Sequence, residues 1–146
     1  MKTYSFSQKA STPDLGLYLI KTSKEKYLDA FITPFRPIVV VNDTEQPGSR
    51  IEFVPMPWQN ENTFCLRSHI KYFVTVDNED AFLRTSDIVI GTAQTFEIVY
   101  HTISGKDKIS FYSHGKHKYV RVDNNMLRAD VETLDESEHF EFIKIT

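Results

Sequence analysis

The chain has 146 residues and a formal net charge of −3, and 40% of its residues are hydrophobic. This length suits one domain with a substantial core, and this hydrophobic content excludes a disordered chain. The acidic balance argues against a dedicated nucleic-acid-binding protein, which usually carries an excess of Lys and Arg.

A single cysteine, Cys65, leaves no internal disulfide, whereas small secreted domains usually carry several. No stretch approaches the roughly 18 apolar residues of a membrane span, and the first residues lack the apolar run of a signal peptide. We therefore expect a soluble, cytoplasmic protein without a membrane span. Secretion after removal of a leader is the alternative.

Three units of similar order follow one another along the chain. Each opens with an alternating apolar strand, then a short turn with Lys or His, then a Lys-Tyr pair that begins a second strand. The three tyrosines, spaced by 45 and 47 residues, are Tyr27, Tyr72 and Tyr119. Each unit closes on a strand with a central glutamate, and these residues, spaced by 45 and 44, are Glu52, Glu97 and Glu141. Two separate landmarks with one period indicate three repeats of a single structural unit.

Each unit has room for roughly four short strands, rich in aromatic and β-branched residues and bounded by turn residues. Three units are too few for a propeller, but three all-β units closed around a pseudo-threefold axis make a β-trefoil. We predict one all-β, β-trefoil domain over residues 1–146, with repeats at approximately 15–57, 61–102 and 106–146. In the first repeat, Pro34 and Pro37 predict a loop that ends in the strand Ile38–Val41.

The alternation along the strands predicts which side chains are buried. We expect the tyrosines of the three units to be equivalent and to begin inward-facing strands, and the glutamates to face away from the core. Cys65 should be a buried thiol. Phe96 and Phe140 should be deeply buried, with Ile51 as their smaller counterpart. A further equivalent set should line the same core: Leu19, Leu66 and Phe111.

The order of strand, Lys-Tyr, strand, turn, strand and Phe-Glu resembles that of the fascin-like β-trefoils, the superfamily of fascin and hisactophilin. "HGKHKYVRVDNNMLRAD" followed by "HFEFI" matches this order well, and the second unit matches it moderately. The resemblance covers nearly the whole chain after Leu15. It implies a non-enzymatic protein-binding module with actin as its partner, although these motifs are structural and speak more for fold than for activity.

The first candidate site is a basic turn in the third repeat, and its cationic or titratable side chains are His114, Lys116, His117, Lys118 and Arg121. Such a cluster suits an acidic protein partner, and binding there should weaken with salt and strengthen below about pH 6.5 as the histidines become charged. The plainer interpretation is a solvated charged face.

The second candidate site is the linker loop between the first two repeats, with Trp58, Gln59, Asn60 and Asn62. An exposed Trp beside amides stacks well on a sugar, which makes a carbohydrate-binding trefoil the alternative function. The other interpretation of Trp58, which we favour, is a plug over the barrel end. The Gln-x-Trp repeat of ricin-type trefoils has one partial match, Gln94-Thr95-Phe96. A third hypothesis is a protease inhibitor or cytokine-like ligand that acts through "ITPFRPI" or "PMPWQNENT".

No residue set indicates a reaction. His114 and His117 supply two ligands where zinc needs three or four, and His69 lies at nearly the same repeat position as His114, which points to turn geometry. Nucleophile elbows, phosphate-binding loops and dinucleotide fingerprints are all missing from the sequence. We therefore expect no catalytic residues, no metal and no cofactor.

Overall fold

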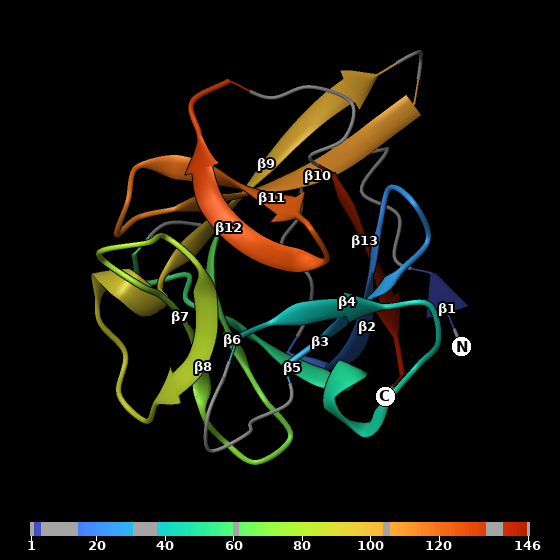
Figure 1. Cartoon of the computed structure of the whole chain (residues 1–146), viewed down its shortest axis with the longest axis horizontal. Coiled ribbons are helices and arrows are strands. Elements are labelled where there is room, and N and C mark those ends of the chain that lie inside the picture. Colours follow the sequence, from blue (N-terminus) through green and yellow to red (C-terminus); the bar gives the residue numbers. More distant parts are fainter. Residues whose placement is uncertain are drawn as a thin grey trace.

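The computed structural model describes residues 2–3, 15–30, 38–59, 62–103, 106–133 and 139–145. Within these ranges it contains thirteen β-strands and two short 3-10 helices, with no α-helix (Figure 1). The prediction of an all-β fold is confirmed.

Strand β1 (Lys2–Thr3) pairs with the last strand, and the other twelve follow as three sets of four. The first repeat contains β2 (Gly16–Thr22), β3 (Tyr27–Asp29), β4 (Val40–Asn42) and β5 (Ile51–Pro55). The second contains β6 (Thr63–Arg67), β7 (Phe73–Val76), β8 (Leu83–Asp87) and β9 (Phe96–Ile103). The third contains β10 (Lys106–Ser113), β11 (Lys118–Asp123), β12 (Met126–Val131) and β13 (Phe140–Lys144). The helices η1 (Pro47–Ser49) and η2 (Thr92–Gln94) precede β5 and β9.

The first and fourth strands of the three repeats close into a barrel. Antiparallel pairs run from β2 to β5, β6, β9, β10 and β13, and β13 pairs again with β2. Closure gives each of these six strands a partner on both sides, so no edge is left open to another chain.

The second and third strands of each repeat form three hairpins that cover one end of the barrel (Figure 1). The hairpins bind one another through backbone hydrogen bonds: the Val39 amide donates to the Leu83 carbonyl at 2.8 Å, and the Leu127 amide donates to the Val39 carbonyl at 3.1 Å. All three side chains are buried, and they lie 44 residues apart in sequence. This spacing and pairing give the hairpins a pseudo-threefold arrangement.

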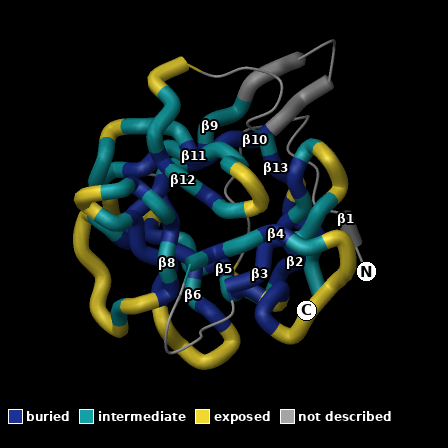
Figure 2. The backbone as a smooth tube through the Cα atoms, in the orientation of Figure 1, coloured by how far each residue is buried: buried dark blue, intermediate teal, exposed yellow. Residues whose placement is uncertain are grey.

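The core lies inside the barrel, where the tube of Figure 2 is darkest. It is built largely of aromatic side chains. Phe111 and Phe140 stack with ring centroids 4.6 Å apart, and Phe53 stacks on Phe64 at 4.8 Å. Burying each such ring stabilises the fold by about 1.5–3 kcal/mol, so the barrel supplies much of the stability.

Two predictions about buried residues are confirmed. Phe96 and Phe140 are buried, and Ile51 is fully buried at the corresponding position. Cys65 is also buried, and this burial raises the pKa of its thiol to about 11, so the sulfur stays protonated and unreactive.

The predicted equivalence of the three tyrosines is wrong for Tyr72. The turns that lead into β3, β7 and β11 each place one residue at positive φ: Glu25 at 60°, Lys71 at 74° and His117 at 55°. The residue two positions after it is Tyr27 in the first repeat, Phe73 in the second and Tyr119 in the third. Phe73 is therefore the equivalent of the two tyrosines. The Lys-Tyr pair of the second repeat is therefore shifted by one position, and Tyr72 is exposed.

The tyrosines also do not point inward. Tyr27 and Tyr119 are half-buried, and the residues after them and after Phe73 enter the core: Leu28, Val74 and Val120. The strand pairings also correct the predicted set of equivalent core residues that includes Leu19. Lys21 pairs with Tyr27 and Arg67 with Phe73, so Ile20 is the equivalent of Leu66 and Phe111 in the main core. Leu19 is buried outside that cluster.

The repeated glutamates face away from the barrel interior, as predicted. Glu52 forms an ion pair with Arg67 on the neighbouring strand, and Glu97 Oε1 lies 3.3 Å from His114 Nε2. Glu141 is exposed. Glu52 and Glu97 therefore support contacts between neighbouring strands, and the three carboxylates do not converge on one site.

Candidate functional site

The predicted basic turn connects β10 to β11 and packs against η2. The His117 amide donates to the Ser113 carbonyl at 2.8 Å, and the Lys116 amide donates to the Ser113 hydroxyl at 3.2 Å. A Cβ atom on Gly115 would lie 3.1 Å from Ala93 Cα, so only glycine fits this approach without displacing η2. The turn is therefore held firmly to the body of the protein.

Three of the five predicted residues lie in the turn and two, Lys118 and Arg121, lie in β11. Most of their charge has an acceptor within the chain. His114 Nε2 lies 3.3 Å from Glu97 Oε1, Lys116 Nζ donates to the Asn78 carbonyl at 3.1 Å, Lys118 Nζ lies 2.9 Å from Glu132 Oε1, and Arg121 Nε donates to Asp130 Oδ1 at 2.6 Å. His117 is exposed. The basic turn thus presents less unpaired charge than its sequence indicates.

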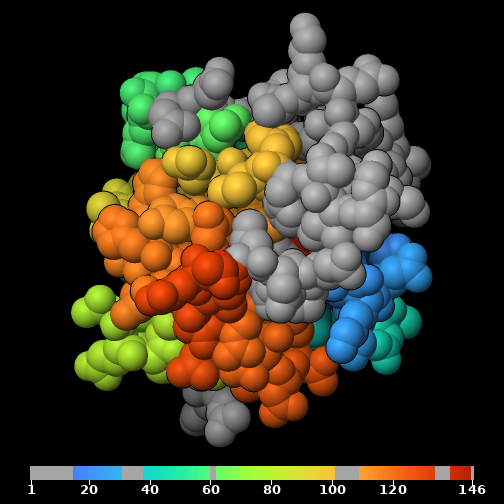
Figure 3. Space-filling view, turned by 90° about the horizontal axis from the view of Figure 1, so that it is seen from above, coloured from blue at the N-terminus to red at the C-terminus, as the bar shows by residue number. Residues whose placement is uncertain are grey.

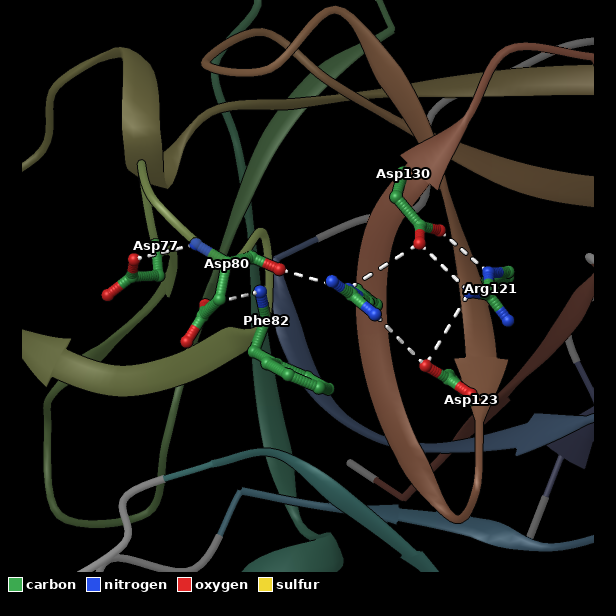
Figure 4. Close-up of polar contacts among 7 residues, drawn as sticks. Asp77, Asp80, Phe82, Arg121, Asp123 and Asp130 are labelled. Atoms are coloured by element: carbon green, nitrogen blue, oxygen red, sulfur yellow. Dashed lines mark hydrogen bonds and ion pairs between the residues drawn. The ribbon is translucent and has the colours of Figure 1, made fainter.

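Arg121 belongs to a network that ties the second and third hairpins together (Figure 4). Its guanidinium contacts Asp130 through two nitrogens and lies 3.5 Å from Asp123. The neighbouring Arg128 donates through Nε to the Asp80 carbonyl at 2.9 Å, across the boundary between the hairpins. The hydrogen bonds from Arg121 lower the pKa of Asp130, which keeps this carboxylate charged and the network intact at neutral pH. We interpret the network as structural.

A second region forms an open cleft where the first and third repeats meet. The turn between β2 and β3 lies opposite the short turn between β11 and β12, and together they enclose a cleft of about 280 Å³. Its lining residues are Thr22, Ser23, Lys24, Lys26, Val122, Asn124 and Asn125. We call it the 1–3 cleft. Figure 3 shows the third repeat, in orange, between a lime segment of the second repeat and a blue segment of the first.

The turn at this cleft is shorter than the turn at the corresponding place in the second repeat. Asn124 and Asn125 are the two residues that link β11 to β12, and both have positive φ, 52° and 65°, as a tight type I′ hairpin turn requires. In the second repeat, four residues separate Asp77 from Phe82, whose backbone groups close the turn at 2.9 Å. That longer turn reaches the basic turn, where its Asn78 carbonyl accepts from Lys116 Nζ. We call this closed contact the 2–3 junction.

The lining of the 1–3 cleft combines amides, hydroxyls and amines. Lys26 Nζ donates to Asn125 Oδ1 at 3.2 Å and lies 3.6 Å from Asp43, which is exposed. Lys24 is exposed, and its amine makes no hydrogen bond or ion pair within the described part of the chain. The lining residues include no carboxylate, and Asp43 already pairs with Lys26, so the groups open to a ligand are amides, hydroxyls and the Lys24 amine.

The Trp58 loop is only partly described. Trp58 is 72% exposed, so the plug interpretation is wrong. The side chain belongs to a tight turn, which is closed by a hydrogen bond of 3.1 Å from the Gln59 amide to the Met56 carbonyl. Asn62 is half-buried, and its carbonyl accepts from the Ile98 amide at 2.9 Å, while Asn60 lies outside the described residues.

The described ranges contain no group of three or more His, Cys, Asp or Glu placed to hold a metal ion. In the same ranges, no helix is long and apolar enough to cross a membrane.

Comparison with known proteins agrees on the fold. The chain superposes on a designed threefold-symmetric protein, ThreeFoil, with a TM-score of 0.73 and 13% identity over 89% of this chain and 99% of that one. The fold is a β-trefoil. The chain also superposes on a lectin of Polyporus squamosus, solved with a human-type influenza-binding epitope, with a TM-score of 0.69 and 16% identity. That alignment covers 92% of this trefoil and about half of the lectin chain, 50%.

No family model matches the sequence, and no curated protein matches it. The comparisons therefore show the β-trefoil fold and leave the likeness to the fascin-like branch as a resemblance.

Sequence reasoning did not find the 1–3 cleft. Its residues come from two repeats far apart in the chain, three of them after Lys26 and four at or before it, and neither segment carries a binding motif. One signal was present: the turn "DNNM" is two residues shorter than the turn "DNEDAF" at the corresponding position of the second repeat. A shorter turn at a repeat boundary predicts a gap there.

Proposed function

We propose that this protein is a non-enzymatic carbohydrate-binding module that holds the acidic terminal sugar of a glycan in the 1–3 cleft. The observation that carries the proposal is the open cleft itself, lined by two lysines, two asparagines and two hydroxyl side chains and by no carboxylate. Sugars present many hydroxyl groups on a small ring, and amide and amine side chains recognise them through directed hydrogen bonds.

The size and chemistry of the cleft support one sugar ring as the ligand. Drug-sized ligands occupy pockets of roughly 300–1,000 Å³, and the 1–3 cleft has about 280 Å³. Lys24 supplies an unpaired cation for a carboxylate or sulfate. Lys26, held by Asn125 at 3.2 Å, presents its remaining donors in a fixed direction. Val122 adds an apolar surface for the C–H face of the ring.

The comparison with the Polyporus squamosus lectin supports this proposal at the level of the fold. The solved complex contains a sialylated oligosaccharide, Neu5Aca2-6Galb1-4GlcNAc, so a β-trefoil of that protein is present in a glycan complex. The two chains are only 16% identical, so the proposed ligand class for this protein depends on the residues of the cleft and not on the likeness to the lectin.

A glycan array with sialylated, sulfated and neutral oligosaccharides tests the proposal, followed by calorimetric titration of the best ligand. Lys24→Ala removes the unpaired cation, and Asn125→Gly removes the amide while keeping a residue that tolerates positive φ. We expect each variant to lower the affinity about tenfold or more, because each removes a hydrogen bond to a polar or charged ligand. Lys116→Ala, in the closed 2–3 junction, is the matched control and should bind normally.

Two outcomes would reject this site. If no acidic glycan binds the wild type, the function is wrong. If binding occurs but only Trp58→Ala abolishes it, the glycan binds at the exposed loop predicted from the sequence and not in the cleft.

Actin binding through the basic turn stays a separate prediction. It is less well supported than glycan binding, because the lysines and the arginine of the basic turn already have acceptors within the chain. Filament co-sedimentation at two salt concentrations, with wild type and the Lys116→Glu/Lys118→Glu variant, tests it. The inhibitor or cytokine-like hypothesis depends on "ITPFRPI" or "PMPWQNENT"; residues 32–37 of the first and 60–61 of the second lie outside the described ranges.

A further inference from the structure

An exposed apolar surface lies at the base of the β7–β8 hairpin, away from the residues of the 1–3 cleft in sequence. Two turns contribute to it, one before β7 and one after β8, and both are exposed in Figure 2. The apolar tip, as we call this surface, consists of Ile70, Tyr72, Ile88, Val89 and Ile90. The two turns are neighbours because Phe73 pairs with Asp87 in the hairpin, so Tyr72 and Ile88 continue from paired residues.

The shape of the apolar tip is convex. Ile88, Val89 and Ile90 are consecutive, and they are 70%, 64% and 44% exposed. Consecutive side chains point in different directions, so three exposed neighbours place this segment on a projection with solvent on more than one side. A single exposed aliphatic residue is ordinary, but a contiguous apolar group of this kind marks an interaction surface.

Hydrogen bonds from a buried side chain, that of Gln94, hold the projection in place. Gln94 is buried, and its Nε2 donates to Asp87 Oδ2 and to Thr75 Oγ1, both at 3.1 Å. The Gly91 amide donates to Gln94 Oε1 at 2.7 Å, so the same side chain binds both ends of the segment 87–91. The aliphatic residues are thereby kept outside the core. This also gives the Gln94-Thr95-Phe96 motif a role in holding the loop.

Lys71 supplies an exposed positive charge at the apolar tip. His69 and Lys71 are exposed on the turn that contributes Ile70 and Tyr72, and Lys71 has no ion pair within the described residues. Asp87, the acidic residue next to the tip, is bonded to buried Gln94. Exposed aliphatic residues beside a lysine match the layers of an anionic bilayer, which presents negative headgroups above apolar chains.

We propose that the apolar tip is a membrane-docking surface that inserts its aliphatic side chains into the outer layer of an anionic lipid bilayer. A second copy of the chain fits the surface less well. A stable protein interface buries about 800 Å² on each partner, and five partly exposed side chains supply only part of that area. A convex projection also needs a concave partner, whereas a fluid bilayer accommodates it without one.

Flotation of the whole protein with glycan-free vesicles tests this proposal independently of glycan binding. Vesicles of phosphatidylcholine alone are compared with vesicles of phosphatidylcholine and phosphatidylserine. We expect binding to the mixed vesicles and about a tenfold or greater loss for Ile88→Ser/Val89→Ser, because two exposed aliphatic side chains no longer enter the bilayer. Lys71→Glu should weaken binding to the mixed vesicles only.

Leu15→Ser is the matched control, because Leu15 is 60% exposed and belongs to neither turn of the apolar tip. It should bind like the wild type, and all variants should unfold at the wild-type temperature since the changed side chains are exposed. The proposal is overturned if the wild type binds neither kind of vesicle. It is also overturned if the double variant binds as well as the wild type. Sedimentation velocity supplies the remaining outcome: a wild-type dimer that Ile88→Ser/Val89→Ser converts to monomer would make the tip a contact between copies and would also overturn it.

Discussion

The 1–3 cleft and the 2–3 junction lie at equivalent boundaries between repeats, and the hairpin turns at the two boundaries differ in length. At the 2–3 junction, a four-residue hairpin turn meets the basic turn, and Lys116 Nζ bonds to the Asn78 carbonyl at 3.1 Å. At the 1–3 cleft, the hairpin turn is only Asn124-Asn125, and a space of about 280 Å³ stays open. The two boundaries therefore differ by two residues in one turn, and the candidate binding site lies at the boundary with the shorter turn.

The largest expected effect tests whether both boundaries depend on the same barrel. Phe140 is buried and stacks on Phe111 at 4.6 Å, beneath the hairpins. Phe140→Ala should lower the free energy of unfolding by about 3–5 kcal/mol, the usual range for a buried Phe. Urea denaturation measures this. A loss below about 1 kcal/mol, typical of a surface change, would show that the barrel does not support the two boundaries.

An intermediate effect is expected when the turn of the closed boundary is shortened. Replacing residues 78–81 by Asn-Asn copies the turn of the third repeat, and it removes the Asp80 carbonyl that accepts from Arg128 and the Asn78 carbonyl that accepts from Lys116. Stability should fall by about 1–2 kcal/mol, as expected for the loss of a few hydrogen bonds.

The shortened variant should also open a second cleft, so the glycan stoichiometry should rise from one to two in calorimetric titration. The reciprocal change, Asn124-Asn125 lengthened to Asn-Glu-Asp-Ala, should close the 1–3 cleft and abolish binding. An unchanged stoichiometry in both variants would mean that turn length does not control the cleft.

The smallest effect concerns pH. Backbone hydrogen bonds from Glu79 and Asp80 lower the pKa of Asp77, the carboxylate that organises the longer turn. A carboxyl whose folded-state pKa is depressed contributes stability above its ordinary pKa of about 3.9 and loses that contribution as the pH falls through the folded-state value. Below about pH 4, the 2–3 junction should therefore loosen first, because the lining of the 1–3 cleft has no carboxylate.

Amide hydrogen exchange at Glu79 and Asp80, measured from neutral to acidic pH, follows this loosening. Asp77→Asn should show fast exchange at neutral pH already and little further change on acidification. Equal acid sensitivity of amides in the Asn124-Asn125 turn would contradict the distinction between the two boundaries.

Sequence reasoning succeeded where residue type and period carry the information. The paired landmarks predicted three repeats and an all-β trefoil, and the alternation around Phe96, Phe140 and Ile51 predicted their burial. It failed where a turn shifts the alignment of one repeat with the others by one residue. The left-handed conformation falls on Lys71 in the second repeat, so Phe73 and not Tyr72 matches Tyr27, although the letters Lys-Tyr recur.

The candidate sites show the same division. The basic turn was predicted as a cationic cluster. Its acceptors could not be foreseen because they come from other parts of the chain: Glu97, Asn78, Glu132 and Asp130. Trp58 was expected to cover the barrel, yet it is 72% exposed. The direction of a loop side chain depends on a backbone turn that residue type alone does not specify.

The sequence by itself determined the repeat, the strand character and the composition of the core, because these follow from the spacing of apolar residues along one chain. The sequence also determined the length of each turn, as a comparison of "DNNM" with "DNEDAF" indicates. Only the tertiary structure decided which turns face each other. Closure of the barrel brings Lys24 and Asn125, about a hundred residues apart, to one cleft, and it sets the hairpin base so that Tyr72 lies next to Ile88. Such contacts depend on how the three repeats are rotated around a shared axis, and no local pattern of residues encodes that rotation.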